Sequence, residues 1–191
     1  MTLLFSIISL LIAITVHEFS HAFVADKLGD PTPRAYGRVS LNPLRHLDPL
    51  GTLIMLIPPH FGWGKPVPID PYNLSKKEEI LVAVAGPISN FILAILLSLI
   101  LRILPFQIIY YIIIMNLVLG IFNLFPIPPL DGSKIFLNLL PEQSSLQWQQ
   151  AFDQYGFILL IVMLLLPIGG SNIINLIISP ILDFLLKILI H

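Results

Sequence analysis

The sequence predicts an all-α polytopic membrane protein, with about five to six transmembrane helices. Of its 191 residues, 56% are hydrophobic and 11% are charged. Soluble domains carry about 25% charged residues, so this composition cannot cover a surface that faces water. Long uncharged runs recur along the chain, and several approach the roughly 20 residues that cross a bilayer. We expect one membrane domain over residues 1–191, with a core over 1–140 and a C-terminal hairpin over 146–190.

The first predicted helix begins with the uncharged run Met1–Val16 and continues into His17-Glu18-Phe19-Ser20-His21. The run is not a cleavable signal peptide, because it lacks a basic start and a small-residue cleavage site. The second core helix is expected over Ile80–Leu101, which is uncharged and long enough to span. The third is expected within the uncharged run Ile103–Leu130.

The C-terminal part predicts a helical hairpin. Pro167-Ile168-Gly169-Gly170 interrupts an otherwise uncharged run, and such a cluster breaks a helix. The two spans are expected near Leu146–Pro167 and Ser171–Ile190.

The polar stretch between the first two core helices predicts small β elements and a re-entrant segment. Ala35–Leu41 alternates loosely, as a short strand does, and the proline-rich Lys65–Ile69 resembles an edge strand. Leu50–Pro59 is apolar, but at 1.5 Å per residue it reaches only about half of a bilayer. A re-entrant or tilted half-helix fits this length better than a full span. A loop on the membrane surface is the alternative.

The pattern His17-Glu18-x-x-His21 predicts a metal site within membrane sequence. Histidines four residues apart lie on one face of a helix, where both imidazoles can bind one zinc ion. The carboxylate of Glu18 is placed to accept a proton from an attacking water. Ionisable groups at bilayer depth are costly, so such a cluster indicates function. The alternatives are a chance match, or a His/Glu pair satisfied inside a helix bundle.

The third ligand of a catalytic zinc has to come from elsewhere, and Asp131 is the candidate. It follows the proline-rich segment Asn123-Leu-Phe-Pro-Ile-Pro-Pro-Leu, and Gly132 after it permits close backbone packing. Asp131 also fits the N-cap of a short helix over Ser133–Leu140. On the residues alone, ligand and cap are about equally supported.

Three motifs taken together resemble the site-2 protease family of intramembrane zinc metalloproteases, in its compact branch without PDZ or CBS domains. They are the H-E-x-x-H pattern, Ala85-Gly-Pro-Ile-Ser-Asn90, and Asn123-Leu-Phe-Pro-Ile-Pro-Pro-Leu-Asp-Gly132, in the family's order. The resemblance implies that one zinc ion is bound by His17, His21 and Asp131 and that Glu18 is the catalytic carboxylate. It implies that Asn90 and Asn123 face the substrate. Both asparagines have an alternative role, which is to hydrogen-bond between helices.

The function implied is a zinc metalloendopeptidase that hydrolyses peptide bonds of transmembrane proteins with a Glu-assisted water. The alternatives are a non-catalytic zinc transporter or sensor, or a structural subunit with a degenerate site. His46 and His60 are weaker candidates for a fourth ligand or a gate, because loop histidines are more often solvated.

The expected partners are a transmembrane protein substrate and the lipid bilayer. The net charge of −1 is uninformative, but the lack of a basic tract argues against nucleic acid, and the lack of cysteine excludes disulfides. The loop after the first helix is rich in Lys and Arg, which favours its placement in the cytoplasm. We therefore expect a protein of the cell membrane with its active site toward the cytoplasmic leaflet and its N-terminus outside. The oligomeric state is not predicted.

Overall fold

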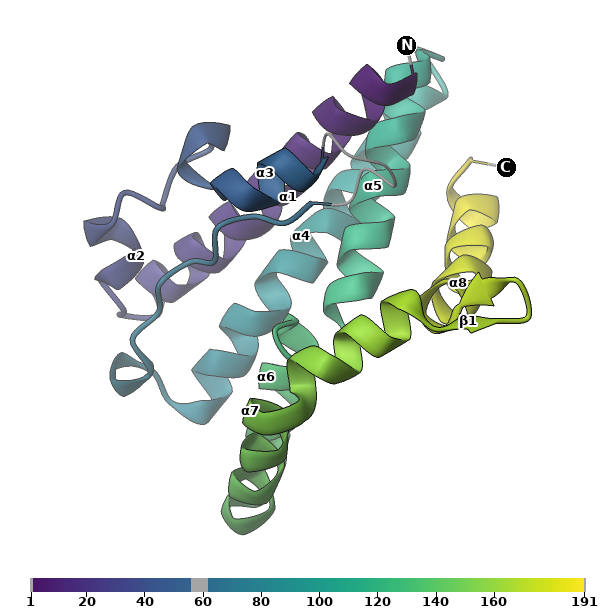
Figure 1. The fold of residues 1–191 in the computed structure, drawn as a ribbon. Coiled ribbons are helices and arrows are strands. Elements are labelled where there is room, and N and C mark those ends of the chain that lie inside the picture. Colours follow the sequence, from purple (N-terminus) through teal and green to yellow (C-terminus); the bar gives the residue numbers. More distant parts are fainter. Residues whose placement is uncertain (1, 56–61, 191) are drawn as a thin grey trace.

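The computed structural model describes residues 2–55 and 62–190, and most of them are helical (Figure 1). The helices and strands are, in chain order, α1 (Thr2–Lys27), α2 (Thr32–Ala35), η1 (Pro43–Arg45), α3 (Pro49–Met55), η2 (Pro71–Asn73), α4 (Lys76–Leu101), α5 (Gln107–Asn123), α6 (Asp131–Leu139), α7 (Glu142–Leu165), β1 (Pro167–Ile168), β2 (Ser171–Asn172) and α8 (Ile173–Ile190). The helices α1, α4 and α5 pack on one another and form the centre of the fold.

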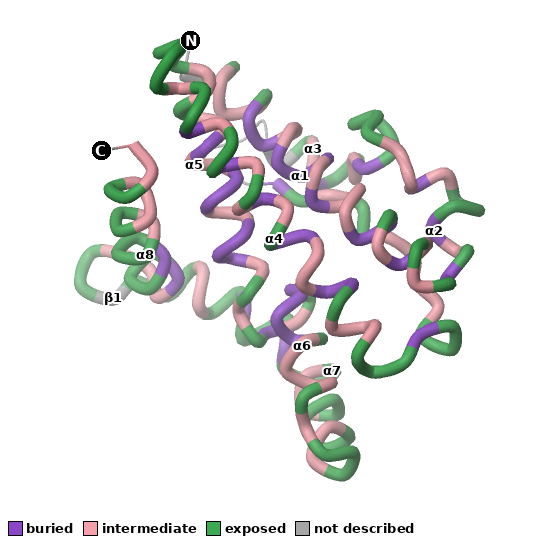
Figure 2. The backbone as a smooth tube through the Cα atoms, turned by 180° about the vertical axis from the view of Figure 1, so that it is seen from behind, coloured by how far each residue is buried: buried purple, intermediate pink, exposed green. Residues whose placement is uncertain are grey.

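Small side chains allow these three helices to approach closely. Ala13 and Ala22 of α1 and Ala94 of α4 are fully buried, and small residues at helix contacts are typical of membrane bundles. Ile113 and Leu117 of α5 pack with Ala94. Buried segments recur along α1, α4 and α5 where these helices meet, and they alternate with intermediate and exposed segments (Figure 2).

The second core helix, expected over Ile80–Leu101, is present as α4. It begins four residues earlier than expected, at Lys76. The cause is a capping box. The backbone N–H of Glu78 donates to the hydroxyl of Ser75, and the backbone N–H of Ser75 donates to the carboxylate of Glu78 at 2.7 Å. These bonds satisfy backbone donors that would otherwise lack partners at the start of a helix.

The third core helix is shorter than the uncharged run that predicted it. The helix α5 covers 17 residues, Gln107–Asn123, instead of most of Ile103–Leu130. Prolines 105, 126, 128 and 129 lack backbone N–H donors and exclude the helix from both flanks. The linker after α5 folds back onto Gly132, where a Cβ atom would overlap the backbone of Leu124 and Phe125. Only glycine fits there, and this packing brings the start of α6 toward α1.

The C-terminal part forms two helices joined by a short antiparallel β pair, and its assignment as a helical hairpin of two membrane spans stays a prediction. The strands β1 and β2 pair antiparallel between α7 and α8, and Gly169 and Gly170 adopt positive φ angles of 59° and 87° in the turn. Three of the described helices are long and apolar enough to cross a membrane, namely α1 from Leu3, α4 and α8, while α5 is a shorter apolar helix. The predicted total of five to six crossings stays a prediction.

The two strands predicted in the polar stretch are wrong. Residues 35–41 contain the end of α2 and a turn, and residues 65–69 are extended without forming a strand. Among the described residues of this stretch, the β element is an isolated bridge between Leu47 and Gly64. The guanidinium of Arg38 donates to the carbonyl of Pro66 at 2.9 Å and to that of Lys65. A side chain thus takes the acceptors that a neighbouring strand would use.

The predicted half-helix over Leu50–Pro59 is described only in part. Its first half forms α3, which ends at Met55. The rest of the segment lies outside the described residues, so re-entry into the membrane stays a prediction.

A buried aspartate ties the two ends of the polar stretch together. The carboxylate of Asp30 accepts hydrogen bonds from the backbone N–H groups of Thr32 and Asp70 and from the side chain of Asn73, at 2.9–3.0 Å. Burial alone would raise the pKa of Asp30, but these hydrogen bonds outweigh it and lower that pKa below its usual value. Asp30 therefore stays ionised and holds the loop against the end of α1.

Candidate metal centre

Two imidazoles of α1 form the first half of the site. His17 and His21 are both buried, and their Nε2 atoms lie 3.1 Å apart. Their rings meet edge to face, with centroids 4.7 Å apart. One helical turn separates them, so the four-residue spacing brings both rings to the same place, as predicted from the sequence.

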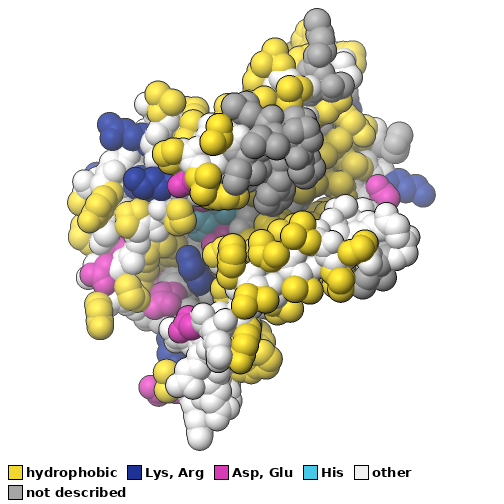
Figure 3. Space-filling model, in the orientation of Figure 1, with side chains coloured by type: hydrophobic (Ala, Val, Ile, Leu, Met, Phe, Trp, Pro, Cys, Tyr) yellow, Lys and Arg dark blue, Asp and Glu magenta, His cyan; other side chains and the backbone are white. Residues whose placement is uncertain are grey.

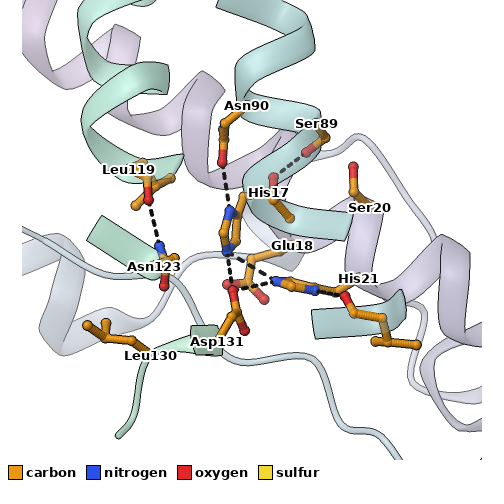
Figure 4. A network of polar contacts seen from close by, with 12 residues as sticks. His17, Glu18, Ser20, His21, Ser89, Asn90, Leu119, Asn123, Leu130 and Asp131 are labelled. Atoms are coloured by element: carbon orange, nitrogen blue, oxygen red, sulfur yellow. Dashed lines mark hydrogen bonds and ion pairs between the residues drawn. The ribbon is translucent and has the colours of Figure 1, made fainter. Parts of the chain in front are cut away.

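Asp131 supplies the other half, from the first residue of α6. Its Oδ2 atom lies 3.1 Å from Nε2 of His17 and 3.0 Å from Nε2 of His21 (Figure 4). The N-cap position of α6 is occupied by Leu130, with no side-chain capping bond. The geometry thus disfavours the cap alternative for Asp131. The three ligand atoms lie within 4.8 Å of one another, a group that could hold a metal ion.

The outer hydrogen bonds of both rings fix which nitrogen carries the proton. Nδ1 of His21 lies 2.7 Å from the carbonyl oxygen of Val82, which can only accept, so Nδ1 of His21 is the donor. Nδ1 of His17 lies 2.7 Å from Oδ1 of Asn90 and donates in the same way. In the neutral rings, both Nε2 atoms therefore present lone pairs.

These lone pairs converge on a carboxylate oxygen, so three acceptors meet without a hydrogen atom between them. While both rings are neutral, such an arrangement is repulsive, and either a metal cation between the three atoms or a proton on one Nε2 atom relieves it. Two imidazole nitrogens and one carboxylate oxygen are a donor set that zinc accepts, and three protein ligands leave a fourth position for water. The residues present therefore fit a catalytic zinc ion.

Gly86 of α4 makes room for the two imidazoles. A Cβ atom at this position would lie 2.7 Å from Cε1 and Nε2 of His17, and closer still to Nε2 of His21. Asn90 follows one turn later on the same helix and bonds His17. The Ala85–Asn90 motif thus combines an empty space for the rings with a hydrogen bond that orients one of them.

We expect Gly86→Ala to disrupt the metal site while leaving most of the fold intact. The added methyl group displaces both imidazoles, so bound zinc and activity should be largely lost, although alanine is the better helix former by about 1 kcal/mol. Zinc content of the purified variant checks this. Gly120→Ala in α5 is the matched control, because its Cβ atom would only meet the Phe91 ring and the Pro87 carbonyl at 3.2–3.3 Å. Normal zinc content in Gly86→Ala would contradict the close approach of α4 to the imidazoles of His17 and His21.

Glu18 lies beside the three converging side chains and lines a cavity with them. Nη2 of the buried Arg38 lies 3.9 Å from Oε2 of Glu18. The contact between Arg38 and Glu18 was not predicted from the sequence. Its carbonyl partners, Lys65 and Pro66, lie 27 and 28 residues further along the chain, and no local pattern signals such a contact.

The cavity has a volume of about 200 Å³ and contains the proposed reacting groups. Histidine side chains are visible in a hollow of the surface, with charged side chains around it (Figure 3). The residues around the cavity are Ile14, His17, Glu18, His21, Gly62, Trp63, Gly64, Pro66, Val67, Ile69, Leu119, Phe122, Asn123, Pro129, Leu130, Asp131 and Lys134.

The two asparagines implied by the resemblance lie in different places. Asn123 lines the cavity and donates to the carbonyl of Leu119 at 3.0 Å. Asn90 is fully buried behind His17, outside the cavity lining, and its amide bonds groups of α1 and α5. The expectation that Asn90 faces the substrate is therefore replaced by its alternative, a hydrogen-bonding role between helices.

His46, one of the two loop histidines considered as a fourth ligand, does not join the group. His46 is fully buried, and its Nε2 atom donates to the carbonyl of Ser40 at 2.6 Å. Burial, together with the nearby charge of Arg38, lowers the pKa of His46 below its usual value, so the ring is neutral at pH 7. His60 lies outside the described residues.

Comparison with known proteins places the chain in a family. The sequence profile of peptidase family M50 matches residues 100–167. YwhC of Bacillus subtilis, named as a candidate zinc metalloprotease, is 38% identical over 180 residues, which covers 86% of this chain and 81% of YwhC. The chain belongs to peptidase family M50. This is the site-2 protease family that the three motifs resemble.

Two further relatives of this M50 chain are longer proteins. Rip2 of Mycolicibacterium smegmatis, also named as a candidate zinc metalloprotease, is 31% identical over 82% of this chain and 65% of its own length. Zinc metalloprotease MJ0392 of Methanocaldococcus jannaschii is 27% identical over 90% of this chain, which spans only 45% of MJ0392. No solved structure matches the chain.

Family membership agrees with the geometry of the site. The cofactor of this M50 chain is zinc, as the family and the names of its relatives imply, and His17, His21 and Asp131 form a group that fits it. The long apolar helices and the family together indicate an integral membrane metalloprotease.

Proposed function

We propose that this chain is an intramembrane zinc endopeptidase that hydrolyses peptide bonds of transmembrane proteins. One observation carries the proposal. The buried group of His17, His21 and Asp131 lies with Glu18 at one cavity, between helices long and apolar enough to cross a membrane. A single zinc ion held by these three residues accounts for the burial of three ionisable side chains, which membrane helices otherwise avoid.

Each residue has a distinct role in this proposal. Zinc, when bound, acts as a Lewis acid that acidifies water and polarises a carbonyl group. Glu18 accepts the proton of the attacking water and delivers it to the leaving amine, which is general base and then general acid catalysis. Asn123, on the cavity wall, donates to the substrate carbonyl or orients the substrate backbone.

The substrate is expected to lie along residues 66–69. Its helix must unwind before attack, because helical carbonyls are hydrogen-bonded. Val67 and Ile69 line the cavity outside any helix, and they follow the carbonyls that Arg38 occupies, so an unwound peptide can lie beside them. The segment Arg38–Leu41 is less suited to this role, because Arg38 is buried and the carbonyl of Ser40 accepts from His46.

A zinc transporter or sensor is the second candidate, and the structure gives it less support. A transporter needs further acidic or histidine ligands along a path through the membrane. Among the residues described, the group of three at His17 is the candidate metal group found. The helix α8 contributes a single carboxylate, Asp183, near its end.

The orientation in the membrane follows from charge. Lys27 ends the first helix, Arg34 and Arg45 follow it, and Lys76 and Lys77 begin the second core helix. Basic loops favour the cytoplasm, which would place the active site toward the cytoplasmic leaflet of the cell membrane.

Cleavage that depends on zinc tests this proposal. Purified protein in detergent is loaded with zinc and incubated with a generic transmembrane reporter, and the products are identified by mass spectrometry. We expect cleavage within the reporter's membrane segment, loss of cleavage after chelation, and recovery on addition of zinc. Zinc uptake into proteoliposomes by a zinc-loaded protein that cleaves no membrane reporter would favour the transporter.

A further inference from the structure

Asn116 of α5 is a buried amide with no place in the motifs described above. It is fully buried and lies outside the cavity lining. Its Nδ2 group donates to the carbonyl of Ile112, one turn earlier in its own helix, at 2.8 Å. A carbonyl can only accept, so this bond fixes the orientation of the amide and turns Oδ1 of Asn116 toward α4.

That oxygen accepts a hydrogen bond from Asn90. Nδ2 of Asn90 donates to Oδ1 of Asn116 at 2.8 Å and to the carbonyl of Ala13 at 3.0 Å. Both hydrogens of the Asn90 amide are thereby used, and its Oδ1 is left to face Nδ1 of His17 at 2.7 Å. Turning the Asn90 amide by 180° would set its oxygen against two other oxygens.

The network links three helices to one ring nitrogen. Asn116 belongs to α5, Asn90 to α4, and Ala13 and His17 to α1. Figure 4 shows Asn90 reaching His17 from the side opposite Asp131. In an apolar interior, a hydrogen bond without water competing for it is strong, and an unsatisfied group is costly. The proton on His17 is therefore directed to Nδ1 by two amides in series.

We propose that Asn116 is a positioning residue for the metal centre. It fixes the amide of Asn90, which keeps the proton of neutral His17 on Nδ1 and leaves the Nε2 lone pair for the metal. This inference rests on the proposed role of His17 as a zinc ligand. It links the metal ligands to α5, the helix that also places Asn123 at the cavity.

Without the acceptor on Asn116, one of the two bonds that orient Asn90 is lost. The Asn90 amide can then turn and present its NH₂ group to His17. That orientation favours a proton on Nε2, where it would block the ligand position. Loss of an outer partner of a metal-bound histidine typically weakens metal affinity about 10–100-fold. Because the carbonyl of Ala13 still orients Asn90, we expect a loss of zinc affinity near the lower end, about tenfold.

The test compares Asn116→Leu with Asn116→Asp in the purified full chain. Leucine has the same number and branching of side-chain heavy atoms as asparagine and lacks the acceptor. Aspartate keeps an acceptor oxygen for Asn90, and in its neutral form its hydroxyl can still donate to Ile112. Ser98→Ala is the control, because Ser98 is a buried polar residue of α4 that bonds only its own helix at Ile95.

Two readouts are measured. Competition with a chromophoric chelator gives zinc affinity, and ¹⁵N spectra of labelled histidines in the metal-free protein give the tautomer of His17. We expect Asn116→Leu to weaken zinc binding about tenfold and to raise the Nε2–H fraction. Asn116→Asp and Ser98→Ala should resemble the wild-type protein. If Asn116→Leu does not fold, Asn116→Ala lacks the same acceptor without added bulk and replaces it.

A double variant tests the route through Asn90. If Asn116 acts only through Asn90, then Asn90→Leu combined with Asn116→Leu binds zinc no more weakly than Asn90→Leu alone. If the losses of zinc affinity from the two substitutions add in the double variant, Asn116 does not act through Asn90. Wild-type affinity and tautomer in Asn116→Leu, or equal losses in the Leu and Asp variants, would overturn the inference itself. A wild-type protein that binds no zinc would instead contradict the proposed function.

Discussion

Asp131→Asn should yield a folded protein with little bound zinc and no peptidase activity. The change replaces a charged oxygen ligand by a neutral amide, and two histidines alone leave a zinc ion mostly solvated. The loss of affinity should exceed the about 10–100-fold that removal of an outer-shell partner costs. The fold should persist, because an amide at position 131 can still hydrogen-bond the Nε2 atoms that Asp131 now contacts.

The same substitution separates the ligand role from the cap role. Asparagine is among the best N-cap residues, so a protein in which Asp131 merely caps α6 would change by a few tenths of a kcal/mol at most. Zinc content and thermal unfolding of Asp131→Asn are measured together. Asp153→Asn in α7 is the matched control, because Asp153 is exposed and outside the cavity lining. Near-normal zinc and activity in Asp131→Asn would remove Asp131 from the ligand set.

Glu18→Gln should keep zinc and abolish cleavage. Glutamine preserves the size and an acceptor oxygen near Arg38, so the site should stay intact, but it cannot accept the proton of the attacking water. General base catalysis typically contributes about 10²–10⁴-fold, and we expect kcat to fall by at least that much. The comparison variant is His21→Ala, which should lose zinc as well as activity. Equal loss of metal in both variants would contradict a separate catalytic role for Glu18.

The parts of the site set by local periodicity could be predicted from the sequence. The spacing of His17 and His21 is enough to place both rings on one face, because the helix around them is long and apolar. Asp131 lies 110 residues from His21 along the chain. The residues alone could not decide its role, because the fold-back of the linker onto Gly132 is a tertiary feature. For Asp131, the family resemblance implied the role of zinc ligand, and the distances to His17 and His21 support this role.

The parts that depend on backbone partners were missed. Residues 65–69 resemble an edge strand, yet their carbonyls bond the side chain of Arg38, and no local pattern reveals such a partner. Asn90 was expected at the substrate because the motif alone does not show which way its side chain points. Its fully buried position behind His17 becomes visible only when α1, α4 and α5 are packed together.

X-ray absorption at the zinc edge of the purified, zinc-loaded protein identifies the ligands of the metal, and so tests whether one zinc ion is held by His17, His21 and Asp131. We expect a single zinc ion per chain, with two imidazole nitrogens and the remaining positions filled by oxygen at about 2.0–2.2 Å. Zinc surrounded by oxygen alone, or by three or more imidazoles, would contradict this set of ligands.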